Sequence, residues 1–402
     1  MPPQEHALLS ASRAKQWLNC PPSARLCETI PEKPSPYADE GHLAHELAEL
    51  VLRKRYTTHL GPKKYKTAVE TAKEAYYKPL IENGTMKPED RKSDEKAMEN
   101  HVAVYTDLVE QQTSAFSHLP YVGIEQRVDF SMYVPGGFTT IDGVVIGDGL
   151  MIVDDFKYGK GVPVSAEENP QLMLGALGAL EYFGMLYPID HVQLTICQPR
   201  LDSISSWETT AADLRAWGES IKPIAQDAWD GLGEFKAGDH CRFCKAKATC
   251  RTYTNQHTAL EDFGYKKPPL LTDEEVGQVL AIGENLLNWL EGLKEYALEA
   301  LLDGRPISGW KAVEGRSNRK IEDVDAAFAA AKQAGQPEAM LYKRQPITLT
   351  ELEKLMGKKP FEDVIGPYVV KPPGAPTLAK ESDKRPAVSR NTTAANDFAE
   401  AN

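Results

Sequence analysis

Three charged side chains in the middle of the chain could together support the hydrolysis of a phosphate ester. Asp155 and Lys157 are two residues apart, just after the apolar run 150–153, and Asp142 lies thirteen residues before Asp155. Carboxylate oxygens bind hard divalent cations, and a cation offsets the charge that grows on a phosphate during hydrolysis. The three residues therefore predict a metal-dependent site centred on Asp142, Asp155 and Lys157.

Two predicted strands hold these residues. Phe138 to Ile146 is predicted to be one strand, 147–149 a tight turn, and Leu150 to Lys157 the next strand. Side chains two apart on a strand lie on one face, so Asp155 shares a face with the lysine, whereas Asp154 points to the opposite face. We therefore assign the site to Asp155 rather than to its neighbour.

The flanking segments alternate between extended and helical patterns. Strands are also predicted at Tyr121–Phe130 and His191–Gln198. Helices are predicted at 39–54, 169–183 and 210–230, with more across the lysine-rich residues 60–118 and, broken by two prolines, across 5–30. This order of elements indicates an α/β protein.

Three of the six cysteines fall within ten residues, as Cys241, Cys244 and Cys250. A disulfide framework is not expected in a cytosolic chain of this length. Three thiolates in C-x₂-C-x₅-C spacing leave one ligand position open, because tetrahedral zinc and 4Fe–4S clusters both take four ligands. The cluster predicts a metal or iron–sulfur centre, whereas Cys197, inside a predicted strand, is expected to be a buried apolar side chain.

The composition is that of a globular protein, with 42% hydrophobic and 26% charged residues. No apolar run is long enough to span a bilayer and the N-terminus lacks a signal peptide, so we expect no membrane partner and a cytoplasmic location, the host cytoplasm if the chain is phage-encoded. The net charge of −12 argues against a broadly cationic surface, but a nucleic-acid groove is local and a metal site is itself acidic.

The C-terminal third has a different pattern. Lys266-Lys-Pro-Pro269 indicates a domain boundary, and Thr272-Asp-Glu-Glu275 is a capping box that opens a long amphipathic helix to about Leu302. Further helices are predicted near 323–333 and 349–356. We therefore expect a core at 1–265, an α-rich extension at 268–379 and a disordered tail at 380–402.

The ordered motifs resemble those of RecB-like nucleases of the PD-(D/E)XK superfamily. The similar phrases are Gly41-His-Leu-Ala-His45-Glu46, Ile141-Asp142-Gly143, Asp155-Phe-Lys157-Tyr-Gly and Gln171. A phage-associated branch, in which Asp-Phe-Lys-Tyr-Gly-Lys-Gly recurs, is the most similar. The resemblance implies a restriction-endonuclease-like α/β core, a mixed central sheet flanked by helices, with helical insertions and a C-terminal α-rich extension.

The same resemblance implies a Mg²⁺- or Mn²⁺-dependent deoxyribonuclease, an exonuclease that acts from DNA ends in phage-type recombination or replication. The implied metal ligands are His45, Asp142, Asp155 and the backbone carbonyl of Phe156; Lys157 would orient water or stabilise the transition state, and Gln171 would position either. The residues alone leave a structural role open for His45 and for Glu125. The family's glutamine motif usually ends in a tyrosine four residues later, where this chain has Gly175.

Iron–sulfur nucleases related to AddB and to the CRISPR adaptation nuclease take one cysteine before the nuclease motifs and three after them. By this resemblance Cys20 joins Cys241, Cys244 and Cys250 around a 4Fe–4S cluster. Cys27 is the alternative upstream ligand, and His240 could instead complete a Zn²⁺ site.

The expected partner is DNA, as a linear duplex or a single strand, together with a recombination or replication protein. DNA contacts are expected at Lys160, Arg242, Lys245 and Lys247. Three alternatives remain open at this point: a non-catalytic DNA-binding module on a nuclease fold, a hydrolase of small phosphates, and a zinc-stapled interaction protein.

Overall fold

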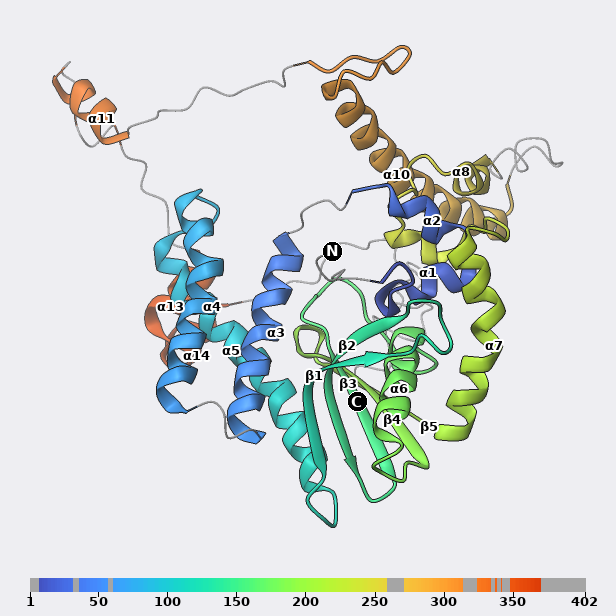
Figure 1. Ribbon diagram of the computed structural model, residues 1–402. Coiled ribbons are helices and arrows are strands. Elements are labelled where there is room, and N and C mark those ends of the chain that lie inside the picture. The colour runs from blue at the N-terminus through green and yellow to red at the C-terminus, as the bar shows by residue number, and fades with distance from the viewer. Residues whose placement is uncertain are drawn as a thin grey trace, which may run out of the picture. The chain divides into compact units, whose positions relative to one another are not determined.

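The computed structural model in Figure 1 describes residues 7–31, 36–56, 61–258, 271–313, 324–333 and 348–369, together with residues 337 and 341. The chain divides into two compact units, Met1–Val313 and Glu314–Asn402. The boundary expected at 265–268 and the tail expected at 380–402 lie outside the described residues. The long helix α10 (Asp273–Leu302) belongs to the first unit, where Trp289 Nε1 donates a hydrogen bond to the Ala248 carbonyl at 3.2 Å.

A five-stranded mixed sheet forms the centre of the first unit. Its strands follow chain order: β1 (Tyr121–Asp129), β2 (Phe138–Gly147), β3 (Leu150–Phe156), β4 (His191–Gln198) and β5 (Ser203–Thr210). Neighbouring strands are antiparallel except β3 and β4, which are parallel and are joined through helix α6 (Pro170–Phe183). The expected α/β class is confirmed, with a mixed sheet that is flanked by helices.

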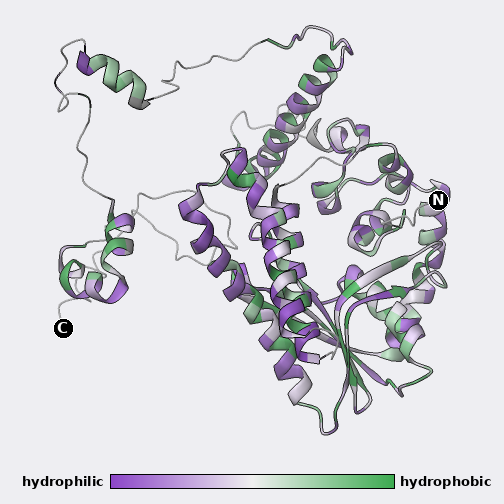
Figure 2. Ribbon diagram, turned by 60° about the vertical axis from the view of Figure 1, so that its left-hand side comes forward, coloured by the Kyte–Doolittle hydropathy of each residue, from purple (hydrophilic) through white to green (hydrophobic). Residues whose placement is uncertain are grey.

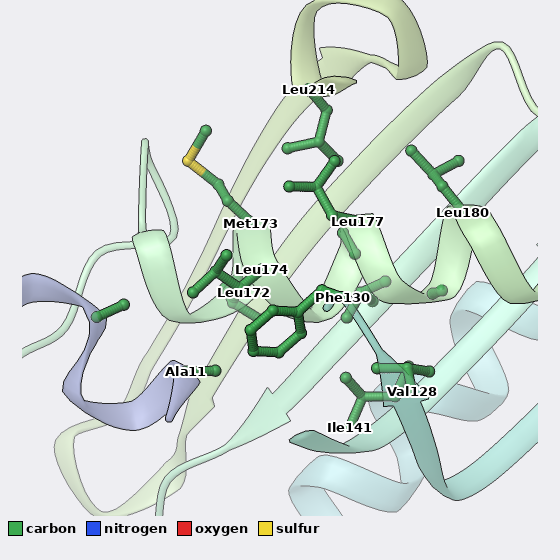
Figure 3. Close-up of a cluster of buried hydrophobic side chains, with 14 of the residues drawn as sticks. Ala11, Val128, Phe130, Ile141, Leu172, Met173, Leu174, Leu177, Leu180 and Leu214 are labelled. Carbon is green, nitrogen blue, oxygen red and sulfur yellow. The ribbon is translucent and has the colours of Figure 1, made fainter. Parts of the chain in front are cut away.

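Two groups of helices cover the two faces of this sheet (Figure 1). Helices α6 and α7 (Ala211–Asp230) cover one face together with the N-terminal turns η1 (Ala11–Arg13), α1 (Ala14–Asn19) and α2 (Ser23–Glu28). Figure 3 shows Leu174 and Leu177 of α6 above Val128 and Ile141 of the sheet, with Phe130 between them. The nearly all-apolar sequence of α6 is explained by this position, because the helix is enclosed by the sheet, α7 and the N-terminal turns.

The other face of the sheet is covered by α3 (Pro36–Tyr56) and α5 (Pro88–Ser114), and α4 (Pro62–Glu82) packs on α3. Their buried side chains form a second core with the opposite face of the strands. In Figure 2 these long helices change between hydrophilic and hydrophobic colour along their length, as amphipathic helices do. The sheet therefore lies between two separate apolar layers, which hold the strand ends in place from both sides.

The remaining elements are shorter. The first unit also contains η2 (Pro199–Leu201), η3 (Asp239–Phe243) and α8 (Arg251–Thr258); the second contains α11 (Val324–Gln333), α13 (Leu349–Met356), α14 (Lys358–Val364) and η4 (Gly366–Tyr368). The helices expected near 323–333 and 349–356 are confirmed. Among the described helices, none combines the length and apolar character that crossing a bilayer requires.

Candidate active site

The hairpin of β2 and β3 opens where its acidic residues lie. The paired register of the two strands ends at Gly143 and Asp154, so Asp142 and Asp155 follow just beyond the last pair. There the Phe156 backbone N–H donates a hydrogen bond to Asp142 Oδ2 at 2.7 Å. This bond fixes one carboxylate oxygen of Asp142 on the neighbouring strand and leaves its other oxygen facing α3.

Two further residues, His45 on α3 and Glu125 on β1, lie close to the Asp142 carboxylate. His45 Nδ1, on α3, is 3.4 Å from Asp142 Oδ1. His45, Glu125 and Asp142 each offer one ligand atom, and these three atoms lie within 4.8 Å of one another. Within the described part of the chain, no other three His, Cys, Asp or Glu side chains meet this criterion. An imidazole nitrogen and two carboxylates from three different elements can hold a divalent cation.

Glu125 reaches this position through a distorted backbone. It stands opposite Asp142, between the pairs Ile124–Gly143 and Gln126–Ile141, and its φ of 47° is in the left-handed region. Such a conformation costs a non-glycine residue about 1–3 kcal/mol and persists only where the surroundings enforce it. Burial, followed by the nearby Asp142 carboxylate, raises the pKa of Glu125 to about 7. Sequence reasoning left the role of Glu125 open, because neither the distortion nor the convergence is visible in the residue order.

A second set of side chains joins β3 to the start of α6. Lys157 Nζ donates to Asp155 Oδ1 at 3.0 Å and to Gln171 Oε1 at 3.3 Å, and Gln171 Nε2 donates to Asp155 Oδ1 at 2.9 Å. Gln171 is held at the first turn of α6, where the Asn169 side chain caps the helix by accepting from the Gln171 backbone N–H. Asp155, Lys157 and Gln171, which the resemblance assigns to one site, are thus in direct contact.

Asp155 has one oxygen in this network and one without a partner. Its Oδ2 is buried and accepts no hydrogen bond from any residue that the structure describes. A buried carboxylate oxygen without a donor is costly, and a bound cation would satisfy it. Of the ligands expected from the resemblance, the structure thus brings His45 and Asp142 together with Glu125, whereas Asp155 lies outside the group whose spacing fits one divalent ion.

Burial and the neighbouring charges have opposite effects on the pKa values of the site residues. Burial raises the pKa of Asp155, against the opposing effect of Lys157. Burial alone would lower the pKa of Lys157 and of His45, but the adjacent Asp155 and Asp142 carboxylates outweigh it and raise both pKa values. The site therefore keeps its lysine charged and contains more acid than its two cationic groups balance.

Asp154 lies on the opposite face of the sheet, as the strand pattern predicts. It is 1% exposed, and Gln112 Nε2 of α5 donates to its Oδ1 at 2.8 Å. Burial raises the pKa of Asp154 to about 7. On the same face Phe156 stacks on Tyr105, with ring centroids 4.8 Å apart, so β3 has a buried structural side behind the candidate site.

The glutamine motif differs from the resembled family for a steric reason. Gly175 faces the sheet, and a Cβ atom there would lie 2.8 Å from Ile141 Cγ2. Any side chain at this position would push α6 away from β2. The position of the family's tyrosine is thus occupied by a close helix–sheet contact.

The cysteine segment folds back on the N-terminal turns. Cys27 Sγ is 3.7 Å from Cys244 Sγ, and Gln16 Nε2 donates to both sulfur atoms at 3.4 and 3.6 Å. The hydrogen bond with Cys244 lowers the pKa of Cys27 to about 5, whereas burial and the nearby Cys20 and Cys250 thiols raise that of Cys241.

Both alternative upstream cysteines thus approach the C-x₂-C-x₅-C segment. His240 turns to the backbone, with Nε2 2.9 Å from the Lys236 carbonyl. Cys197 is 1% exposed in β4, where burial raises its pKa to about 12, which agrees with an apolar structural role.

The cations expected to contact DNA are divided between two places. Lys160 is exposed three residues after Lys157. Arg242, Lys245 and Lys247 lie in the cysteine segment, where Lys245 Nζ donates to the Ile30 carbonyl at 3.1 Å and Lys247 Nζ to the Arg242 carbonyl at 3.3 Å. The two lysines therefore brace this segment, and Arg242 stacks on Phe243 at 5.6 Å.

Comparison with solved structures gives a distant likeness. A protein designated SSO0001, known from a crystal structure, is 16% identical, and the match covers 60% of this chain and 96% of that one with a TM-score of 0.21. A similarity at this level does not support an argument about fold or activity.

Comparison with protein families gives a match over nearly the whole chain. It extends from residue 6 to residue 386 and includes every residue of the candidate site. The chain therefore belongs to the family described as Protein of unknown function (DUF2800).

Proposed function

We propose that this protein is a metal-dependent DNA nuclease with a RecB-like, PD-(D/E)XK active site, and that it degrades DNA from its ends in phage-type recombination or replication. The observation that supports the proposal is that two sets of side chains lie next to each other at the open end of the β2–β3 hairpin. A His45–Glu125–Asp142 ligand set lies beside a hydrogen-bonded Asp155–Lys157–Gln171 set. Phosphodiester hydrolysis needs this combination of cation-binding oxygens and a fixed ammonium group.

Each residue has a definable task in this reaction. His45, Glu125 and Asp142 would hold Mg²⁺ or Mn²⁺, and Asp155, the further ligand that the resemblance implies, has a free oxygen close enough to interact electrostatically with His45 and Asp142. When bound, such an ion supplies Lewis acidity to a phosphate oxygen and to water. Lys157 presents its ammonium group to the charge that develops on the phosphate, and Gln171 keeps that ammonium and Asp155 in register through hydrogen bonds to both.

The cysteine segment would act as a structural staple. We propose a 4Fe–4S cluster on Cys20, Cys241, Cys244 and Cys250, with Zn²⁺ as the alternative metal. The support is that Cys20 and Cys250 lie near enough to Cys241 to raise its pKa, while the alternative Cys27 is the upstream cysteine in contact with Cys244. A metal-centred link between such distant segments restricts the unfolded chain and so favours the folded state.

The decisive assay compares end-labelled linear DNA with circular DNA, each with Mg²⁺ and with Mn²⁺. Asp155→Asn should abolish cleavage, and Lys157→Ala should reduce it by about 100-fold or more, because a preorganised charge is lost from the transition state. Asp148→Asn is the matched control: Asp148 lies at the closed end of the same hairpin, with φ 47° that asparagine tolerates.

Full activity in the Asp155 and Lys157 variants, with circular dichroism spectra unchanged, would overturn the proposal. Cleavage of linear but not circular DNA is the expected pattern for an exonuclease.

A further inference from the structure

We propose that the groove next to the active site binds a single DNA strand by its bases and leads it to the candidate catalytic residues. This inference rests on the proposed function and names its substrate class. The groove has a volume of about 960 Å³ and extends from the N-terminal turns to the start of α6. Gln171 lines the groove and also hydrogen bonds to Asp155 and Lys157, so a strand that follows the groove to Gln171 comes next to the site.

Aromatic rings are the main feature of the groove walls. Trp207 on β5, Trp217 on α7 and Phe243 on η3 all line it. The two tryptophans are half-buried and pack on the core of the α6 face, which holds their rings in place, whereas Phe243 is 78% exposed. Nucleotide bases stack on such rings without regard to sequence.

The charged residues that line the groove are mostly acidic, so a nucleic acid fits there only if it can turn its phosphates away from them. Glu167, Glu168 and Asp213 line the wall formed by the 162–169 loop and α7. Exposed Lys15 lines the groove from α1, and the Arg242 guanidinium lies 5.6 Å from the Phe243 ring centroid. A single strand can turn its phosphates toward these two cations and away from the acids, whereas a duplex would present phosphates to both walls.

The wall beside the active site is preformed. Gln198, which is 2% exposed, accepts from the Val164 backbone N–H at 2.7 Å and donates to the Val162 carbonyl at 3.0 Å. The Ser205 hydroxyl accepts from the Ala166 backbone N–H at 3.0 Å. The loop between Lys157 and Gln171 is thus fastened to β4 and β5, so that little ordering of the protein is needed when a strand binds.

Binding is tested without cleavage, with fluorescein-labelled dT15 in EDTA and fluorescence anisotropy as the readout. The full-length protein should bind dT15 more tightly than a 15-base-pair duplex. Phe243→Ala should weaken dT15 binding by about tenfold, the loss that one base–aromatic stack corresponds to. Trp310→Ala is the matched control, since Trp310 is also an exposed ring, at 69%, but does not line the groove.

The Trp217 ring also packs on the core, so its removal could unfold the protein, and two conservative substitutions are compared instead. Trp217→Phe keeps a stacking ring and should retain most of the affinity, whereas Trp217→Leu keeps only apolar volume and should lose it about tenfold. Equal affinity of the two variants, with equal melting temperatures, would overturn a stacking role.

Photo-crosslinking locates the strand independently. An oligonucleotide with 5-iodouracil should crosslink within residues 162–171, 207–217 or at Phe243, as identified by mass spectrometry. Bound oligonucleotide that crosslinks only elsewhere, or a preference for duplex, would overturn the groove assignment. So would crosslinks that persist unchanged in Phe243→Ala together with unchanged affinity.

The two proposals fail in different ways. If the wild-type protein cleaves DNA but Phe243→Ala binds dT15 as tightly as the Trp310→Ala control, the groove assignment is wrong and the nuclease proposal stands. If dT15 binds and crosslinks in the groove but no DNA is cleaved with either metal, the groove stands and the nuclease proposal fails. Phe243→Ala should also raise KM for single-stranded DNA with little change in kcat, because Phe243 is assigned to strand binding and is not one of the candidate catalytic residues.

Discussion

Replacing Glu125 by glutamine should have opposite effects on stability with and without metal. The ligand atoms of Glu125 and Asp142 lie within 4.8 Å of each other. At an effective dielectric constant of 20, two unit charges at this separation repel by about 3 kcal/mol, and the nearby His45 offsets part of this. In EDTA at pH 8, where the Glu125 carboxylate is charged, Glu125→Gln should therefore be more stable than the wild type by about 1–2 kcal/mol.

The same substitution should weaken divalent-metal binding, because an amide oxygen carries no charge. A tenfold rise in Kd removes about 1.4 kcal/mol of the stabilisation that saturating metal provides. When Mn²⁺ replaces EDTA, the melting temperature of Glu125→Gln should therefore become equal to or lower than that of the wild type.

Differential scanning fluorimetry at pH 8 measures both effects. The wild type should gain several degrees from Mn²⁺, and Glu125→Gln should start higher and gain less. Glu208→Gln, an exposed glutamate on β5, is the control and should follow the wild type. A Glu125 variant that melts lower than wild type in EDTA, or that gains as much from Mn²⁺, would refute the reasoning.

Three further predictions follow from contacts away from Glu125. Gly175→Ala should lower the melting temperature by an amount that corresponds to about 1–3 kcal/mol of unfolding free energy, because the added methyl group overpacks the contact between α6 and the sheet; an unchanged melting temperature would contradict the contact. When the protein is purified without oxygen, Cys20→Ser should lose bound iron and Cys27→Ser should retain it, as measured by iron and acid-labile sulfide content; the reverse would assign Cys27 as the ligand. Burial raises the pKa of Glu95, but hydrogen bonds from Arg91 and Lys73 outweigh it and lower this pKa overall. The Glu95 carboxylate therefore stabilises the fold above its ordinary pKa, and this stabilisation is lost as the pH falls through the lowered pKa. Glu95→Gln should therefore lose less melting temperature than the wild type between pH 5 and pH 3, and an equal loss in both proteins would contradict this prediction.

Most of the elements that position the site were predictable from periodicity. The strands around Asp142 and Asp155 and the helix that begins at Pro170 have strong apolar patterns, because each is buried on at least one face. The face on which Asp154 lies also followed from the two-residue repeat of a strand. Local patterns suffice where burial dictates the residue types.

Strand β5 was not predicted. Its sequence, Ser-Ile-Ser-Ser-Trp-Glu-Thr-Thr, is that of an exposed edge strand, with small hydroxyl side chains where an interior strand carries valine or isoleucine. Its pairing with β4 decides its structure, and pairing is a long-range contact that local composition does not report.

The roles of Glu125 and Gly175 could not be derived from the sequence either. Glu125 joins His45 and Asp142 only through strand register and a left-handed backbone, and Gly175 lies against Ile141 only because α6 approaches β2 so closely. The proximity of Cys27 to Cys244 is likewise a property of the tertiary fold. Spacing in the chain indicates which residue types are available, whereas register and helix approach decide which of them meet.

The contact between the N-terminal turns and the cysteine segment has a consequence for synthesis of the protein. Cys27 and Cys244 are 217 residues apart, and the turns also bury Leu9, Ala11 and Trp17 against α6 and α7. At typical translation rates of about 5–20 residues per second, roughly 10–40 seconds separate the emergence of the two cysteines from the ribosome. The N-terminal turns are made long before the cysteine segment that they contact, and during that interval their apolar side chains are open to chaperones and to unwanted contacts.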